Sequence, residues 1–140
     1  MRLQNEATPW VERETLIEAN PEEVWEAITD EDRLAEWLAE EVELDPVEGG
    51  EATFRSDEGE RSGTVQTVEE EERFAFTWSR PGEGESLVEF TIEAVPDGTR
   101  LTVIETPIGP MASWTASATM GGWSRRLTRL CDHIALVPVA

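Results

Sequence analysis

Residues 17 to 30 read I-E-A-N-P-E-E-V-W-E-A-I-T-D and mark the passage from a strand into a helix. Asn20 is a typical helix N-cap, and Pro21 follows at the first helical position, where its missing N–H is no loss. Glu22 and Glu23 then place negative charge in the first turn, beside the positive end of the helix dipole. This stretch therefore predicts a helix that begins directly after a strand.

The neighbouring segments extend this order in both directions. A strand is expected from Trp10 to Glu18, and charges on both of its faces indicate an edge position or an exposed convex side. After the first helix, a second short helix is expected to begin at Asp30. Its inward-facing residues are Leu34, Trp37 and Leu38.

A run of about six antiparallel strands follows the two helices. The expected ranges are 41–44, 51–55, 61–68, 73–80, 86–95 and 99–105. The last two form the most secure hairpin, because Pro96-Asp97-Gly98 between them is a turn in which glycine supplies a positive φ.

A long helix is expected to start between Met111 and Ala116 and to end near Leu136. Gly121 and Gly122 near its start indicate a kink, a late start or a close backbone approach, and the sequence leaves these alternatives open. Its apolar residues follow spacings of three and four, which is typical of one buried helix face. They are Met120, Trp123, Leu127, Leu130, Ile134 and Val137.

This order of elements resembles the SRPBCC or START-like superfamily. The closest branch is the AHSA-type family of homologues of an activator of a heat-shock-protein ATPase, which is also grouped with polyketide cyclases. The stretches that carry the resemblance are 17–30, 34–37, 73–78 (R-F-A-F-T-W) and 98–102 (G-T-R-L-T).

The resemblance implies an α+β helix-grip fold. In this fold a curved antiparallel sheet, here of about six to seven strands, wraps around a long C-terminal helix. The two short helices after the first strand close one end, and a cavity between sheet and helix binds apolar ligands. We expect residues 1–9 to be a flexible lead and residues 10–140 to form a single domain of this type.

The charge of the chain narrows the classes of partner. There are 31 acidic residues against 11 basic ones, all of them arginine, and the formal net charge is −20. Such a charge repels phosphate backbones and anionic lipid headgroups, so we expect neither nucleic acid binding nor membrane insertion. A polar start and the lack of a long apolar segment predict a soluble, cytoplasmic protein.

The six tryptophans support two interpretations that the sequence leaves open. They fill the core, or some of them line a pocket for a planar or acyl ligand. On the second interpretation, the expected partner is a small apolar ligand. The predicted lining residues are Trp37, Phe54, Phe76, Trp78, Phe90, Met111, Trp114, Met120, Trp123 and Leu127.

No catalytic residue, metal site or cofactor is predicted. Cys131 and His133 are the only residues of their kinds, and they point to different sides of a helix. We interpret Cys131 as a packed apolar residue and His133 as an exposed residue favoured by the helix dipole. Acidic residues between Glu36 and Asp45 lack the spacing of a calcium loop and favour a solvated face.

Three functions therefore remain, in this order. The first is binding of a small apolar or aromatic ligand between the sheet and the last helix. The second is a cyclase- or aromatase-like enzyme, which needs a polar group inside the pocket. The third is an interaction protein that regulates a chaperone ATPase. Either a monomer or a homodimer fits the sequence.

Overall fold

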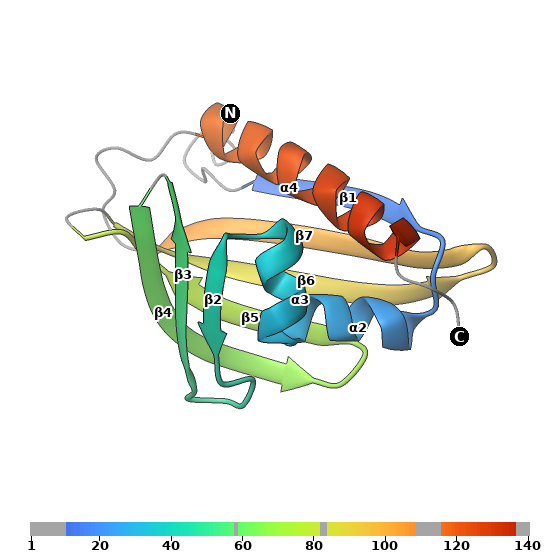
Figure 1. Cartoon of the computed structure of the whole chain (residues 1–140), viewed down its shortest axis with the longest axis horizontal. Helices are drawn as coiled ribbons and strands as arrows, with labels where there is room; N and C mark the ends of the chain where they lie inside the picture. Colours follow the sequence, from blue (N-terminus) through green and yellow to red (C-terminus); the bar gives the residue numbers. More distant parts are fainter. Residues whose placement is uncertain (1–10, 58, 82–83, 109–115, 137–140) are drawn as a thin grey trace, which may run out of the picture.

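The computed structural model describes residues 11–57, 59–81, 84–108 and 116–136 (Figure 1). In the last helix it describes the side chains of residues 122–134. The elements follow the predicted order of strand, two helices, strands and long helix. They are β1 (Val11–Ile17), α2 (Pro21–Thr29), α3 (Glu31–Trp37), β2 (Glu41–Leu44), β3 (Glu51–Ser56), β4 (Gly59–Glu69), β5 (Arg73–Trp78), β6 (Glu85–Val95), β7 (Gly98–Ile108) and α4 (Ala116–Leu136).

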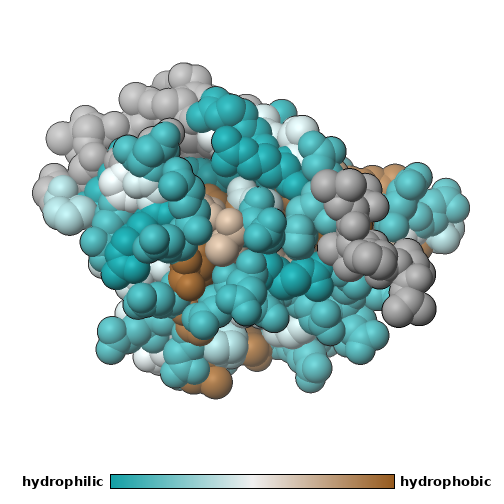
Figure 2. Space-filling model, in the orientation of Figure 1, coloured by the Kyte–Doolittle hydropathy of each residue, from teal (hydrophilic) through white to brown (hydrophobic). Residues whose placement is uncertain are grey.

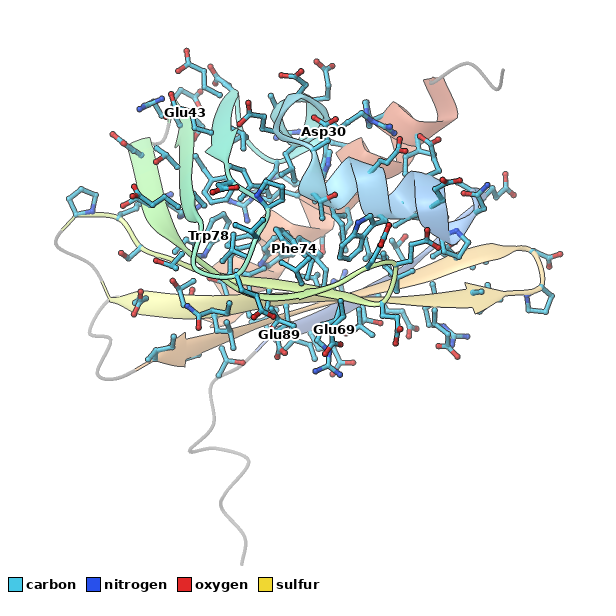
Figure 3. All side chains as sticks on the ribbon, turned by 90° about the horizontal axis from the view of Figure 1, so that it is seen from below. Asp30, Glu43, Glu69, Phe74, Trp78 and Glu89 are labelled. Carbon is cyan, nitrogen blue, oxygen red and sulfur yellow. The ribbon has the colours of Figure 1, made fainter. Side chains whose placement is uncertain are left out.

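The strands form one antiparallel sheet in the order β1-β7-β6-β5-β4-β3-β2. A register shift between Val65 and Thr67 interrupts the pairing of β4 with β5, and such bulges bend a strand. The sheet is curved, and the helices lie on one side of it (Figures 1 and 3). This arrangement confirms the predicted α+β helix-grip fold, and the number of strands is seven.

The two short helices begin where the sequence predicts. The Asn20 side chain accepts a hydrogen bond from the Glu23 N–H at 2.9 Å, and the Asp30 side chain accepts one from the Asp32 N–H at 2.8 Å. Trp37 ties the helices together, because its indole N–H donates to the Ala27 carbonyl at 2.9 Å. Local hydrogen bonds therefore fix the starts of both helices and hold the two helices together.

The hairpin of β6 and β7 is the longest pairing in the sheet. Gly98 sits at its turn with φ +152°, and a Cβ there would lie 2.1 Å from the Ile17 carbonyl oxygen. β7 extends to Ile108, beyond the predicted end at residue 105, because residues up to Ile108 pair with β6 as far as Glu85. The last three residues of β7 therefore belong to the strand although apolar and polar residues no longer alternate there.

Among the described strands β1 pairs only with β7, so of the two predicted alternatives for this charged strand the structure shows the edge position. The opposite edge is β2, which pairs with β3. None of the described helices combines the length and apolar character that a bilayer-crossing helix needs. The face in Figure 2 is mostly hydrophilic with scattered hydrophobic spots, in keeping with the excess of charged residues.

The core lies between the sheet and the helices. Figure 3 shows Phe74 and Trp78 on the side of the sheet that faces the helices, and Glu69 and Glu89 on the other side. This placement follows from the period-two alternation of strand side chains. The predicted apolar face of α4 is buried at every position that the structure describes: Trp123, Leu127, Leu130 and Ile134.

Candidate functional site

A carboxyl group is buried in the core beside the first half of α4. Glu105 lies on β7 and is 5% exposed. It follows Thr99, Leu101 and Val103 at intervals of two, and all three are buried. The alternation of β7 therefore turns the Glu105 side chain inward. An unpartnered carboxylate would be costly in such a place, so its hydrogen bonds decide whether the arrangement is stable.

Three side chains donate to Glu105. The Trp78 indole N–H donates to Oε2 at 2.8 Å, and the Trp123 indole N–H donates to Oε1 at 2.7 Å. The Ser86 hydroxyl also donates to Oε2. These residues come from β5, β6 and α4, so the carboxyl group joins three sheet strands to the long helix. We call Glu105, Trp78, Trp123 and Ser86 the Glu105 cluster.

Aromatic rings surround this cluster. The Trp78 and Trp123 rings stack with centroids 5.9 Å apart and an angle of 22° between their planes. Phe90 meets Trp123 edge-on at 5.7 Å, and Phe54 meets Trp78 edge-on at 5.4 Å. Edge-to-face and offset contacts at these distances are the favourable geometries of aromatic pairs. The cluster is therefore a polar group enclosed by rings.

Two arginines lie against the stacked indoles. The Arg61 guanidinium carbon lies 4.4 Å from the Trp78 ring centroid. The Arg126 guanidinium carbon lies 5.4 Å from the Trp78 centroid and 5.0 Å from that of Trp123. All three distances are within the range of cation–π attraction. Positive charge thus flanks the rings that hold Glu105.

The structure brings most of the predicted lining residues together. Those with described side chains are at most 5% exposed and belong to one core: Trp37, Phe54, Phe76, Trp78, Phe90, Trp123 and Leu127. Their rings touch one another, as between Phe54 and Phe76 at 5.1 Å. Met111 and Trp114 lie outside the described residues, as does the side chain of Met120. The assignment of these ten residues to a ligand stays a prediction.

Two cavities lie along the part of α4 whose side chains the structure describes. One has a volume of about 310 Å³ and separates α4 from the edge strand. Its lining residues are Arg13, Glu14, Thr15, Ser124, Leu127, Thr128, Cys131 and Asp132. The other, which we call the arginine cavity, has a volume of about 190 Å³. Its lining residues are Leu38, Glu40, Ser56, Asp57, Gly122, Arg125, Arg126 and Arg129.

His133 is not the exposed residue that the sequence predicted. It is partly buried, and its Nε2 accepts a hydrogen bond from Arg33 Nε at 2.9 Å. Burial and then the nearby Arg33 charge lower the pKa of His133. The prediction was wrong because α3 packs against this part of α4, which the helix-dipole argument did not include.

Cys131 has the packed position that the sequence predicted. Cys131 is partly buried against the core, and its Sγ lies 3.6 Å from the Thr15 hydroxyl oxygen. Arg55, Arg73 and Arg100 pair with surface glutamates. Among the residues that the structure describes, no three His, Cys, Asp or Glu side chains gather as a metal ion requires.

Sequence reasoning missed Glu105, although the signal was present. The alternation from Leu101 through Val103 places residue 105 on the inner face, and we treated it only as the end of the strand. Likewise, Ser86, Val88 and Phe90 follow one another at intervals of two and share one face of β6. A charged or polar residue at a strand position that faces the apolar side indicates a buried polar group.

The family of the chain is established by its sequence. The family model described as Activator of Hsp90 ATPase homolog 1-like protein matches residues 18–135. The chain belongs to this family. It is accordingly a member of the AHSA branch of SRPBCC domains, a class whose fold is suited to ligand binding. Among curated proteins, none matches the chain.

Solved structures agree with this family and fold. Protein MLL2253 from Mesorhizobium loti is 24% identical with a TM-score of 0.84, over 93% of this chain and 99% of that one. DynU16, from the dynemicin biosynthetic locus, is 28% identical with a TM-score of 0.82; the match covers 91% of this chain and 48% of DynU16. CalU16 from Micromonospora echinospora is 26% identical with a TM-score of 0.73, over 89% and 74%. The chain thus spans about half the length of DynU16.

Proposed function

We propose that this Activator of Hsp90 ATPase homolog 1-like family member binds a small apolar or aromatic ligand between the sheet and α4. The observation that carries the proposal is the Glu105 cluster, a buried polar group set among aromatic rings. Binding sites for small molecules combine apolar walls with a few convergent polar groups in this way. The similarity to DynU16, a protein of a biosynthetic locus, supports a small-molecule ligand.

We expect the ligand to bind where the sheet contacts α4, next to Trp78 and Trp123. The described rings are in contact with one another, so the ligand needs space that opens when side chains move apart. Arg126 lies close to both indoles, and we expect its long side chain to move aside when a ligand enters. A planar ligand would replace it by stacking on the same ring faces.

The geometry favours binding over acid–base catalysis. Glu105 is an ionisable group inside the aromatic core, as a cyclase would need. However, its two oxygens already accept hydrogen bonds from Trp78, Trp123 and Ser86. A carboxyl group held by three protein donors is fixed as an acceptor, whereas a general base must reach a proton on the substrate.

The experiment is a fluorescence titration with N-phenyl-1-naphthylamine, a neutral aromatic probe. We expect saturable probe emission at one site per chain, with quenching of tryptophan emission. Trp78→Phe should weaken binding, because it removes the indole that stacks on Trp123 and holds Glu105. Trp25→Phe is the matched control, since Trp25 contacts Phe74 from α2 and lies outside the Glu105 cluster.

Two results would contradict the proposal. One is probe emission that does not saturate. The other is equal weakening by Trp78→Phe and Trp25→Phe, which would reflect general loosening of the core. Native mass spectrometry of the protein from its own cells provides an independent check, because a bound small molecule would add its mass to the chain.

A further inference from the structure

The arginine cavity is unusual for the charge of its walls. The chain has 11 arginines and a net charge of −20, yet Arg125, Arg126 and Arg129 of α4 share one small cavity. They stand at positions i, i+1 and i+4, so Arg125 and Arg129 lie on one face of the helix. A concentration of positive charge in so acidic a chain needs a physical explanation.

Ion pairing within the protein does not supply that explanation. Arg33, Arg55, Arg73 and Arg100 each pair with at least one glutamate. Arg125 and Arg129, by contrast, form no ion pair with any residue in the described ranges. Two guanidinium groups at the cavity therefore retain their capacity to bind an anion.

Gly122 is one of the residues that line the arginine cavity. A Cβ at this position would lie 3.4 Å from an Arg126 terminal nitrogen and 3.9 Å from an Arg125 one. The ends of both side chains therefore lie beside Gly122, one turn back along the helix. Gly122 also adjoins Trp123, so the cavity and the Glu105 cluster are neighbours along α4.

Arg126 connects the cavity to the aromatic rings. It lines the cavity and also lies over Trp78 and Trp123. A ligand that displaced Arg126 from the indoles would therefore have its apolar part on the rings and its other end beside Arg125 and Arg129. These two residues are suited to a carboxylate, which guanidinium groups bind with paired hydrogen bonds.

We propose that the ligand is an aromatic or acyl carboxylic acid whose carboxylate binds Arg125 and Arg129 while its apolar body lies against Trp78 and Trp123. This inference rests on the proposed function and specifies its ligand class. Glu40 and Asp57 also line the cavity and repel anions. A monoanion meets less repulsion from them, and from the net charge, than a phosphate dianion does, which is why we assign a carboxylate.

The experiment compares 2-naphthoate with the neutral 2-naphthamide, two probes of nearly equal shape. Calorimetric titration should show naphthoate binding about tenfold more tightly, the scale of one charge-assisted hydrogen bond. The double variant Arg125→Gln/Arg129→Gln should remove this preference, so that the two probes bind with similar affinity. Both residues are exposed, so the variant should fold as the wild type does.

The matched control is Arg73→Gln/Arg100→Gln, which makes the same change in net charge at sites away from the cavity. This control should keep the tenfold preference. If the wild type binds both probes equally, or if both double variants lose the preference alike, the carboxylate site is wrong and apolar binding stands. If neither probe binds, the proposed function fails, and this inference fails with it.

Discussion

The two ends of α4 pack against the rest of the protein in different ways. Near its start, Trp123 contacts rings of the sheet and donates a hydrogen bond to a buried carboxyl group. Near its end, Leu130 and Ile134 are buried in the apolar core, and His133 contacts Arg33 of α3 at the rim. The end with Leu130 and Ile134 stabilises the fold mainly by burial of apolar side chains. The part with Trp123 combines burial with a buried carboxyl group that a simple core does not need.

The largest expected loss of stability comes from a substitution at the apolar end of α4. Leu130 is 0% exposed, and Leu130→Ala should lower the free energy of unfolding by about 2–5 kcal/mol, because it leaves a cavity in a packed core. Leu16→Ala is the control, since Leu16 is 56% exposed. Urea unfolding followed by circular dichroism measures both. Equal losses of unfolding free energy in the two variants would show that Leu130 is not packed as the structure places it.

The next effect concerns the buried carboxyl group. Glu105→Gln replaces one acceptor oxygen with an NH₂ group, so at least one indole N–H of Trp78 or Trp123 loses its acceptor. The free energy of unfolding should fall by about 1–3 kcal/mol, the cost of one unsatisfied buried donor. Glu89→Gln on the opposite face of the sheet should change it by less than about 0.5 kcal/mol. A neutral or stabilising Glu105→Gln would contradict the hydrogen-bond assignment.

A smaller effect tests whether the Glu105 cluster acts as a unit. Ser86→Ala removes one donor to Glu105 and should cost about 1 kcal/mol in unfolding free energy. In the Glu105→Gln background the same substitution should cost less, because the two residues share a hydrogen bond. A double-mutant cycle in urea measures the difference. Strictly additive costs would mean that Ser86 and Glu105 are not coupled.

The smallest effect is a pH dependence at the other end of the helix. The folded protein lowers the pKa of His133, so the unfolded chain binds the extra proton more readily. Stability should therefore fall as the pH falls below about 6.5, the ordinary histidine value. His133→Gln keeps an acceptor for Arg33 and should reduce this dependence between pH 7 and pH 5.5. An unchanged pH profile in the variant would assign the dependence to the carboxylates.

The sequence predicted the fold closely because its signals are local. The Asn20 cap, the Pro96-Asp97-Gly98 turn and the apolar spacing of the last helix each follow from neighbouring residues. The site was harder to predict from the sequence. Glu105, Trp78 and Trp123 lie far apart in the chain and meet only when β5, β7 and α4 pack together. The inward direction of Glu105 could be predicted from strand alternation, but its partners could not. His133 shows the same limit, because its pKa depends on Arg33 one hundred residues away.

The open sheet has a consequence for how copies of this protein meet. In the described strands, β1 and β2 each pair on one side only, and such edges can recruit further strands. On β2, Glu41 and Glu43 are exposed at alternate positions. A second β2 added in antiparallel register about Val42 would set Glu41 against Glu43 twice, and like charges opposed across strands are destabilising. We therefore expect the acidic residues on β2 to oppose the addition of a second strand at this edge, and salt, which screens charge, to weaken that effect.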